Sequence, residues 1–270
     1  MKKGVLLFAY NNEECDYYTM AVATARRINH FLDLPVSIVT TKDYAYPDPA
    51  IDQLIFQAPD NSNKKDGLLW NNTGRFNAWT LTPYDETIVL DADYVVNSRK
   101  LLKVFDFYDD FCCHDKTSFL MIPDAEQEYL SKLSLRSVWA TVMYFKKTKR
   151  SRHIFQCMRM IQNNFQHYAN IHNFVSATYR NDYSLTLALR IVNGHTDNKQ
   201  DFIPWNLVHV GKSTRVIHHE NFDRVKNTEF LINYDNWKNN KIKKEYMIVK
   251  DMDFHMLNKE NFIGLFKNHE

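Results

Sequence analysis

The stretch Thr87-Ile88-Val89-Leu90-Asp91-Ala92-Asp93-Tyr94-Val95-Val96 decides the fold class of this chain. Its apolar run, Ile88-Val89-Leu90, is typical of a strand buried inside a parallel sheet. Asp91 and Asp93 follow at once, at the end of the strand where open α/β sheets bind ligands. Two such carboxylates can converge on one hard cation, and a cation neutralises a diphosphate better than side chains alone. The alternative is that the two acids only cap the next helix.

Apolar runs and helical periodicity before this stretch predict the rest of the sheet. Gly4 to Tyr10 and Pro35 to Thr40 have the composition of buried strands, and Asp16 to Phe31 between them has helical spacing of apolar residues. A strand, a helix and a strand form a βαβ unit with a right-handed crossover. Asp52 to Ala58 adds a further short strand. We therefore expect an α/β fold with a mixed, mostly parallel sheet flanked by helices.

Beyond residue 97 the pattern alternates between strands and helices. We expect strands at Ser118–Ile122 and Val138–Phe145 and helices at Arg150–Tyr168 and Tyr183–Val192. Two polar segments, Asp60 to Gly74 and the Lys/Asn-rich Trp237 to Lys244, are predicted to be surface loops, and Tyr246 to Lys250 is predicted to be the last element. No internal repeat or Pro-rich linker divides the sequence, so a single domain over residues 1–270 is expected.

The amino-acid composition excludes a disordered or a fibrous protein. A hydrophobic fraction of 44% and a charged fraction of 24% are ordinary for a globular domain. With 34 basic and 32 acidic residues, no overall field attracts a polyanion from a distance. Cys15, Cys112-Cys113 and Cys157 have neither metal-ligand spacing nor a disulfide pattern, which favours reduced thiols in a cytoplasm. No apolar run approaches the roughly 18 residues of a membrane span.

The segment Pro83 to Asp93 resembles the metal-binding segment of glycogenin-like and related GT-A glycosyltransferases. The resemblance implies a Rossmann-like GT-A fold, in which residues 1–97 bind the nucleotide-sugar and residues 98–270 face the acceptor. It also implies a nucleoside diphosphate sugar as donor, uridine-based in this family, and Mn²⁺ or Mg²⁺ as cofactor. Asp91 and Asp93 would hold the metal.

The same resemblance assigns the contacts to the nucleotide-sugar. They lie at the ends of the first two strands, before and within the metal segment, and near the C-terminus, at Ala9, Tyr10, Asn11, Thr40, Arg75, Asp91, Ala92, Asp93 and Lys259. An alternative for Arg75 is an exposed loop cation. Lys212 competes with Lys259 as the lysine that reaches a phosphate.

A histidine completes the metal site in the family that this chain resembles. The segment Asp251 to Lys259 resembles the late segment that supplies it, which makes His255 the expected third ligand. His209, in Val208 to Lys212, and His218 remain alternatives. A neutral imidazole beside two carboxylates suits Mn²⁺.

Two segments resemble the acceptor side of the family. Trp139 to Thr148 resembles its apolar acceptor-side strand. In the family a turn of small residues precedes this strand, and this sequence has no glycine at that place. Arg180 to Tyr183 resembles an acidic motif at a helix start, so Asp182 is the candidate catalytic residue. It would act as general base if the reaction inverts configuration, or position the sugar if configuration is retained. The alternative is that Asp182 caps its helix.

The acceptor has several candidates. Phage-type sugar-adding enzymes modify hydroxymethylated bases in DNA, and a basic strip near Phe145 and Phe155 can contact phosphates. The cations of this strip are Lys146, Lys147, Lys149, Arg150 and Arg152. A solvated helix start is the alternative for the strip. A glycan, lipopolysaccharide or protein acceptor is the alternative to DNA, and a non-catalytic nucleotide-sugar binder is the alternative to an enzyme.

Overall fold

The computed structural model describes residues 1–65, 68–69, 74–120, 122–126, 128–131, 135–174, 178–196, 198–217, 222–238 and 241–266. Its main sheet has six strands in the order β3 (Gln53–Phe56), β2 (Val36–Thr40), β1 (Lys3–Phe8), β6 (Glu86–Leu90), β11 (Trp139–Lys146) and β8 (Phe111–His114). The first four run parallel, whereas β11 is antiparallel to both of its neighbours. The predicted mixed, mostly parallel sheet is confirmed.

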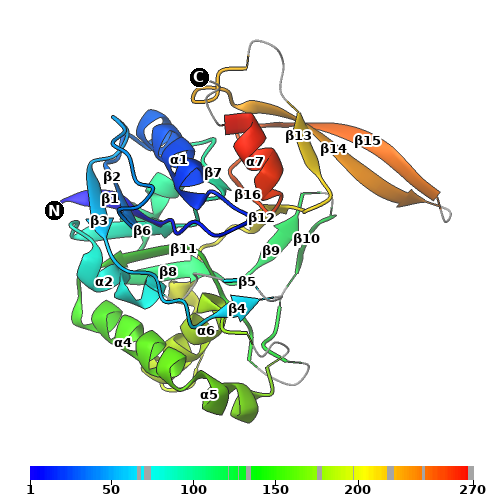
Figure 1. Ribbon diagram of the computed structural model, residues 1–270. Coiled ribbons are helices and arrows are strands. Elements are labelled where there is room, and N and C mark those ends of the chain that lie inside the picture. Colours follow the sequence, from blue (N-terminus) through cyan, green and yellow to red (C-terminus); the bar gives the residue numbers. More distant parts are fainter. Residues whose placement is uncertain are drawn as a thin grey trace.

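Helices cover both faces of this sheet, and the alternation of side chains along β1 shows why. Val5 and Leu7 point into the core below α1 (Tyr17–Leu32), whereas Leu6 points into the core shared with α4 (Lys149–Asn163) and α6 (Asn181–Val192). Figure 1 shows α1 on one side of the sheet and α4 and α6 on the other. Both faces of the sheet are therefore buried, as is usual for parallel strands.

A second sheet brings the C-terminal part of the chain to the end of β6. Its order is β10 (Ile122–Glu126), β9 (Thr117–Phe119), β12 (Leu207–Val210), β16 (Phe254–Met256) and β7 (Tyr94–Val95). Strand β7 begins directly after Asp93 and pairs with β16, which pairs in turn with β12. In this register Tyr94 lies opposite His255, and His255 lies opposite His209.

The remaining elements lie around these two sheets. A three-stranded sheet consists of β13 (Arg215–Ile217) and the long hairpin of β14 (Glu229–Lys238) and β15 (Lys241–Lys250), which projects from the body in Figure 1. The short helices and strands are β4 (Lys64–Lys65), β5 (Leu68–Leu69), η1 (Gly74–Asn77), α2 (Ala78–Leu81), η2 (Lys100–Lys103), α3 (Val104–Phe107), α5 (Phe165–His172), η3 (Lys199–Asp201) and α7 (Lys259–Phe266). Of the helices in the described ranges, none is both long and apolar enough to cross a bilayer.

Two predictions about elements near the C-terminus were wrong. Of the predicted loop Trp237 to Lys244, residues 237–238 lie in β14 and residues 241–244 lie in β15, and Phe230 and Ile232 are buried on one face of β14. That two-residue alternation outweighs the polar composition near the tip. Tyr246 to Lys250 is not the last element, because β16 and α7 follow it.

The helix predicted over Arg150 to Tyr168 is two helices, which divide at Asn164. There the side-chain amide of Asn164 donates to the carbonyl oxygen of Met160, 2.8 Å away, and its backbone leaves helical geometry. The predicted loop Asp60 to Gly74 includes β4 and β5, and residues 66, 67 and 70–73 of it lie outside the described residues.

Candidate functional site

The two acids of the Asp-x-Asp segment sit in a tight turn at the carboxyl end of β6. The backbone N–H of Asp91 donates to the carbonyl of Thr141, 3.0 Å away, and the N–H of Tyr94 donates to the carbonyl of Asp91, 3.1 Å away. The hydroxyl of Thr24 on α1 donates to the carbonyl of Ala92 at 2.8 Å. These bonds fix the backbone on both sides of the turn, so both carboxylates emerge at the same edge of the sheet.

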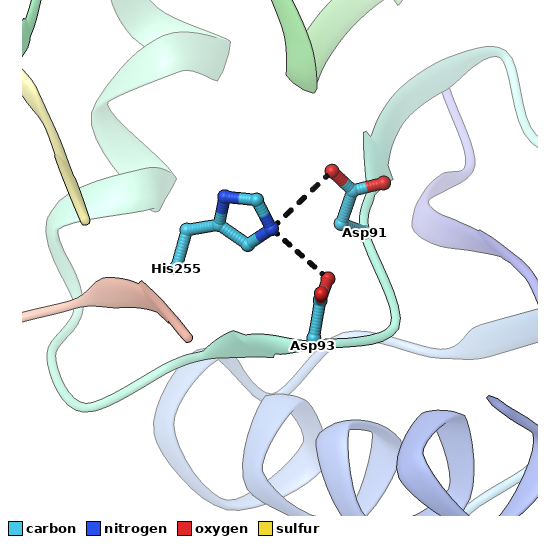
Figure 2. A group of neighbouring side chains, drawn as sticks. All are labelled: Asp91, Asp93 and His255. Atoms are coloured by element: carbon cyan, nitrogen blue, oxygen red, sulfur yellow. Dashed lines mark hydrogen bonds and ion pairs between the residues drawn. The ribbon is translucent and has the colours of Figure 1, made fainter. Parts of the chain in front are cut away.

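His255 meets both carboxylates. Its Nε2 atom lies 3.1 Å from Oδ1 of Asp93 and 3.8 Å from Oδ2 of Asp91. Figure 2 shows the three side chains pointing toward one another from β16 and from the turn after β6. One ligand atom from each residue lies within 4.8 Å of the others. Two carboxylate oxygens and an imidazole nitrogen suit Mn²⁺ or another divalent first-row metal.

Lys259 lies beside Asp93. Its Nζ atom is 3.8 Å from Oδ2 of Asp93 and donates to the hydroxyl of Tyr17. Burial by itself would raise the pKa of Asp93, but its interactions with His255 and Lys259 hold it well below its usual range. Burial would also lower the pKa of Lys259, and Asp93 and Tyr17 raise it instead. The two groups therefore stay oppositely charged at neutral pH.

Arg75 forms an ion pair with Asp91, and its Nη1 atom donates to the carbonyl of Ala140 at 2.6 Å. Its side chain is only 11% exposed, so the alternative of an exposed loop cation is wrong. The ion pair uses Oδ1 of Asp91, whereas Oδ2 faces His255. Asp91 is thus held by a cationic side chain and still presents an oxygen to the centre of the cluster.

The other predicted nucleotide contacts lie at the carboxyl ends of β1 and β2. Ala9 and Tyr10 are buried, and burial raises the pKa of the Tyr10 hydroxyl. The side chain of Asn11 is committed to α1, since it accepts from the N–H of Tyr18 at 2.8 Å and donates to Asp16 at 2.9 Å. Thr40 is buried, and its hydroxyl has no hydrogen-bond partner among the described residues.

Asp182 does not cap its own helix. Its Oδ1 atom accepts the N–H of Ala140 on β11 at 2.8 Å, and its Oδ2 atom lies 2.7 Å from Nη2 of Arg180. The N-cap of α6 is Arg180, which makes no side-chain cap bond. Because the carbonyl of Ala140 accepts from Arg75, this one residue joins Asp182 to the ion pair at Asp91. The capping alternative is therefore wrong.

A pocket of about 180 Å³ opens next to Asp182. Aromatic and charged side chains share its wall, and they are Glu128, Tyr129, Ser137, Trp139, Arg180, Asp182 and Tyr183. The guanidinium of Arg180 lies 5.4 Å from the ring centroid of Trp139. Rings beside paired charged groups are the usual combination in sites that orient a polar ring-shaped ligand.

The geometry distinguishes His255 from the other histidines that were considered as the third metal ligand. His209 does not face the carboxylates; it packs behind His255, with the two Nδ1 atoms 3.0 Å apart, and its ring lies 4.8 Å from that of Trp139. Burial, reinforced by His255, lowers the pKa of His209 to about 3. His218 lies outside the described residues. Lys212 is exposed, whereas Lys259 adjoins the cluster.

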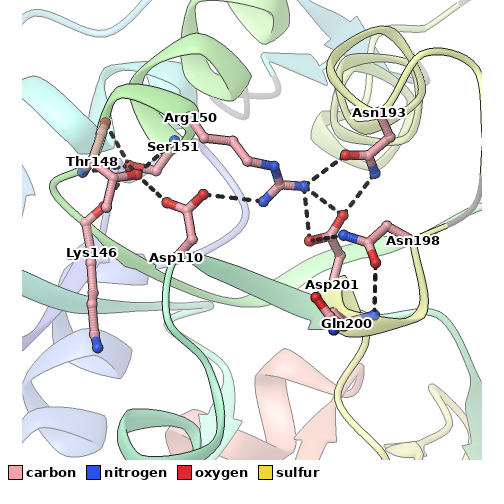
Figure 3. A network of polar contacts seen from close by, with 9 residues as sticks. All are labelled: Asp110, Lys146, Thr148, Arg150, Ser151, Asn193, Asn198, Gln200 and Asp201. Carbon is pink, nitrogen blue, oxygen red and sulfur yellow. Dashed lines mark hydrogen bonds and ion pairs between the residues drawn. The ribbon is translucent and has the colours of Figure 1, made fainter.

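The basic strip proposed for DNA does not present its rings. Phe145 and Phe155 are buried in the core. Arg150 is held in the network of Figure 3, where it lies 2.7 Å from Asp201 and 3.3 Å from Asp110. The ammonium of Lys147 donates to the carbonyl of Thr82 at 2.9 Å. These contacts stabilise the start of α4, and neither Phe145 nor Phe155 offers an exposed ring.

Two contributors to the site were not assigned from the sequence. Tyr17, the first residue of α1, contacts Lys259, and no motif marks it. The contact between His209 and His255 was missed because His209 was considered only as a rival ligand. Alternation in Val208-His209-Val210, which points His209 to one face of a strand, was the available signal.

No protein-family model and no curated protein matches this chain. Several similar solved structures are glycosyltransferases. The galactosyltransferase LgtC, in complex with donor and acceptor sugar analogues, has a TM-score of 0.47 and 12% identity, over 69% of this chain and 70% of that chain. Mouse xyloside xylosyltransferase 1 has a TM-score of 0.41 and 10% identity, over 72% of this chain and 83% of that chain. The glycosyltransferase GlyE of Streptococcus pneumoniae TIGR4 has a TM-score of 0.40 and 11% identity, over 75% of this chain and 44% of that chain. These TM-scores lie below 0.5, so the similarities do not assign a function to this chain.

Proposed function

We propose that this chain is a metal-dependent glycosyltransferase, which moves a sugar from a uridine diphosphate donor to a hydroxyl acceptor. The observation that carries the proposal is the convergence of Asp91, Asp93 and His255, two carboxylates and an imidazole, within 4.8 Å at the carboxyl edge of a mostly parallel sheet. Lys259 adds a positive charge beside them. Such a site matches a cation that bridges to a diphosphate.

Each group in this cluster has a distinct part in binding the donor. A divalent cation, when bound by Asp91, Asp93 and His255, neutralises the diphosphate that departs from the sugar. The ammonium of Lys259 is positioned to bind a phosphate oxygen at the same edge of the sheet. Arg75 keeps Asp91 oriented through the ion pair between them. In this proposal Ala9, Tyr10 and Thr40 border the nucleoside at the carboxyl ends of β1 and β2.

The pocket beside Asp182 is proposed to hold the acceptor. Trp139 and Tyr183 offer ring faces on which a sugar ring stacks, and Glu128 and Asp182 offer carboxylates that accept hydrogen bonds from its hydroxyls. The N–H of Ala140 and the guanidinium of Arg180 fix the direction of the Asp182 carboxylate. An oriented carboxylate can remove the acceptor proton, or hold the acceptor in place if configuration is retained.

A glycan acceptor fits these residues better than hydroxymethylated phage DNA does. The pocket wall includes two acids, Glu128 and Asp182, and the strip at Lys146 to Arg152 has its phenylalanines buried and Arg150 in ion pairs. Binding to modified duplex DNA that weakens steeply with salt would favour DNA instead. A protein acceptor would present its sugar or hydroxyl to the same pocket.

The direct test is release of nucleoside diphosphate from a panel of UDP- and GDP-sugars with Mn²⁺ and a mixture of oligosaccharide acceptors. We expect release with a UDP-sugar, loss of release on chelation, and loss in Asp91→Asn. Lys149→Gln, at an exposed position outside the site, serves as the control and should keep full activity. Tight donor binding without release, for every donor and acceptor, would identify a non-catalytic binder.

A further inference from the structure

His209 and His255 make a direct contact that the proposed cluster does not explain. Strands β12 and β16 run parallel with these two residues in register, and the Nδ1 atoms lie 3.0 Å apart. Both side chains are buried, at 2% and 7% exposure. A hydrogen bond at this distance requires that one nitrogen carries a proton and the other presents a lone pair.

The partner on the far side of His255 decides which nitrogen carries the proton. Without a cation, Nε2 of His255 lies 3.1 Å from a carboxylate oxygen of Asp93, which only accepts hydrogen bonds, so Nε2 carries the proton. The Nδ1 atom of His255 then accepts from Nδ1 of His209. With a cation between the three groups, Nε2 must present its lone pair, so the proton lies on Nδ1 and His209 must accept it.

We propose that His209 is a positioning residue for the metal site, which supports His255 in both tautomers by exchanging the direction of this hydrogen bond. The inference rests on the proposed function, since it requires a cation at Asp91, Asp93 and His255. The proton balance is even. Each imidazole carries one proton before and after, because His255 moves its proton from Nε2 to Nδ1 and His209 moves its own from Nδ1 to Nε2, with water as carrier.

The surroundings of His209 suit this task. The centroid of its ring lies 4.8 Å from that of Trp139 and 5.5 Å from that of Phe119, so the imidazole packs between two aromatic rings. Its Nε2 atom has no hydrogen-bond partner among the described residues, so no neighbour there imposes one tautomer. A carboxylate or a backbone carbonyl in the same place would accept only, and would support His255 in one form.

The first test measures Mn²⁺ affinity from the electron paramagnetic resonance signal of free Mn²⁺, with the folded state checked by circular dichroism. We expect His209→Leu to weaken binding about 10- to 100-fold, the usual effect of removing the partner of a ligating histidine. His209→Asn, whose amide lies near the Nδ1 position and can accept from His255, should recover most of that loss. His114→Leu, the same change at a buried histidine without hydrogen bonds to the cluster, should leave affinity unchanged.

The outcomes separate the two proposals. Binding in His209→Leu within twofold of the original protein would overturn the role of His209, and so would equal losses in the Leu and Asn variants, which would point to packing. Absence of Mn²⁺ binding in the unaltered protein would overturn the proposed function itself.

If His209→Leu does not fold, nuclear magnetic resonance of ¹⁵N-histidine in the unaltered protein gives the answer. The proton on His255 should move from Nε2 to Nδ1 when saturating Mg²⁺ is added. A proton that stays on Nε2 would contradict the inference.

Discussion

The Nε2 atom of His255 lies 3.1 Å from Oδ1 of Asp93, although 162 residues separate the two in the sequence. Pairing of β16 with β7 produces this contact, since β7 begins one residue after Asp93. The candidate metal site is therefore completed by a strand near the C-terminal end of the described residues. Lys259, in the first turn of the helix that follows, is brought in by the same connection.

Replacing Lys259 by Gln should weaken nucleoside diphosphate binding. A hydrogen bond to a charged group contributes roughly 1.5–3 kcal/mol, so the dissociation constant for UDP in the presence of Mn²⁺ should rise by about 10- to 100-fold. Isothermal titration calorimetry measures it. Lys212→Gln is the control, because that lysine is exposed and was the rival assignment. Equal losses in both variants would show that only net charge matters.

Replacing Arg150 by Met should destabilise the fold without involving the site. Asp201 is buried and lies 2.7 Å from Arg150, so the substitution leaves a buried carboxylate without its cation. Breaking such a pair costs about 3–5 kcal/mol. Urea unfolding should show a loss in this range, whereas Lys149→Met at the exposed neighbouring position should change the free energy of unfolding by less than about 0.5 kcal/mol. A small loss for Arg150 would mean that the amide of Asn193, which already donates to Asp201 at 2.8 Å, is enough to hold the buried carboxylate.

Replacing Gly4 by Ala should also destabilise the chain. A Cβ atom at Gly4 would lie 2.5 Å from ring atoms of Tyr84, which is itself buried. Overpacking of this kind costs about 1–3 kcal/mol. The matched control is Gly264→Ala in α7, where nothing lies within 4 Å and the change should be neutral or stabilising. Thermal unfolding compares the two, and a neutral Gly4 variant would contradict the packing described for Tyr84.

His114 should make the fold acid-sensitive. Burial, with a smaller effect of Lys100, lowers its pKa from 6.5 to about 3. Above pH 6.5 the imidazole is neutral in both states and contributes nothing. Between pH 6.5 and about 3 only the unfolded chain binds the proton, so stability falls by up to about 1.4 kcal/mol per pH unit as pH decreases.

The substitution His114→Phe removes the imidazole and with it this contribution to the pH dependence of stability. The free energy of unfolding in urea should therefore fall less between pH 6.5 and 5 in that variant than in the unaltered protein. An identical fall in both would show that His114 is protonated in the folded state.

The main sheet was predictable because its signals are local. Apolar runs such as Val36 to Thr40, and the helical spacing after Asp16, report burial on two faces without knowledge of the partners. The hairpin of β14 and β15 was missed because lysines and asparagines near its tip hide the alternation that buries Phe230 and Ile232. The average polarity of such a segment does not reveal that buried and exposed side chains alternate along a strand.

The site was predictable only in part. Asp91 and Asp93 lie in one segment, so their geometry follows from the strand that precedes them. His255 was identified by resemblance, whereas its contact with His209 depends on the pairing of β12 with β16, which no local pattern specifies. Arg75 was assigned as a nucleotide contact, and its ion pair with Asp91 depends on the placement of η1 beside the end of β6, which spacing does not encode.

The central claim is that Asp93 helps hold a cation that in turn holds a diphosphate, and the most direct measurement is the affinity for UDP with and without Mn²⁺. In the unaltered protein, Mn²⁺ should strengthen UDP binding at least 10-fold, and the pair should raise the midpoint of thermal unfolding. In Asp93→Asn, which keeps the shape of the buried side chain, Mn²⁺ should have no effect on UDP binding. UDP binding that is equally tight with and without Mn²⁺ in the unaltered protein would contradict the account.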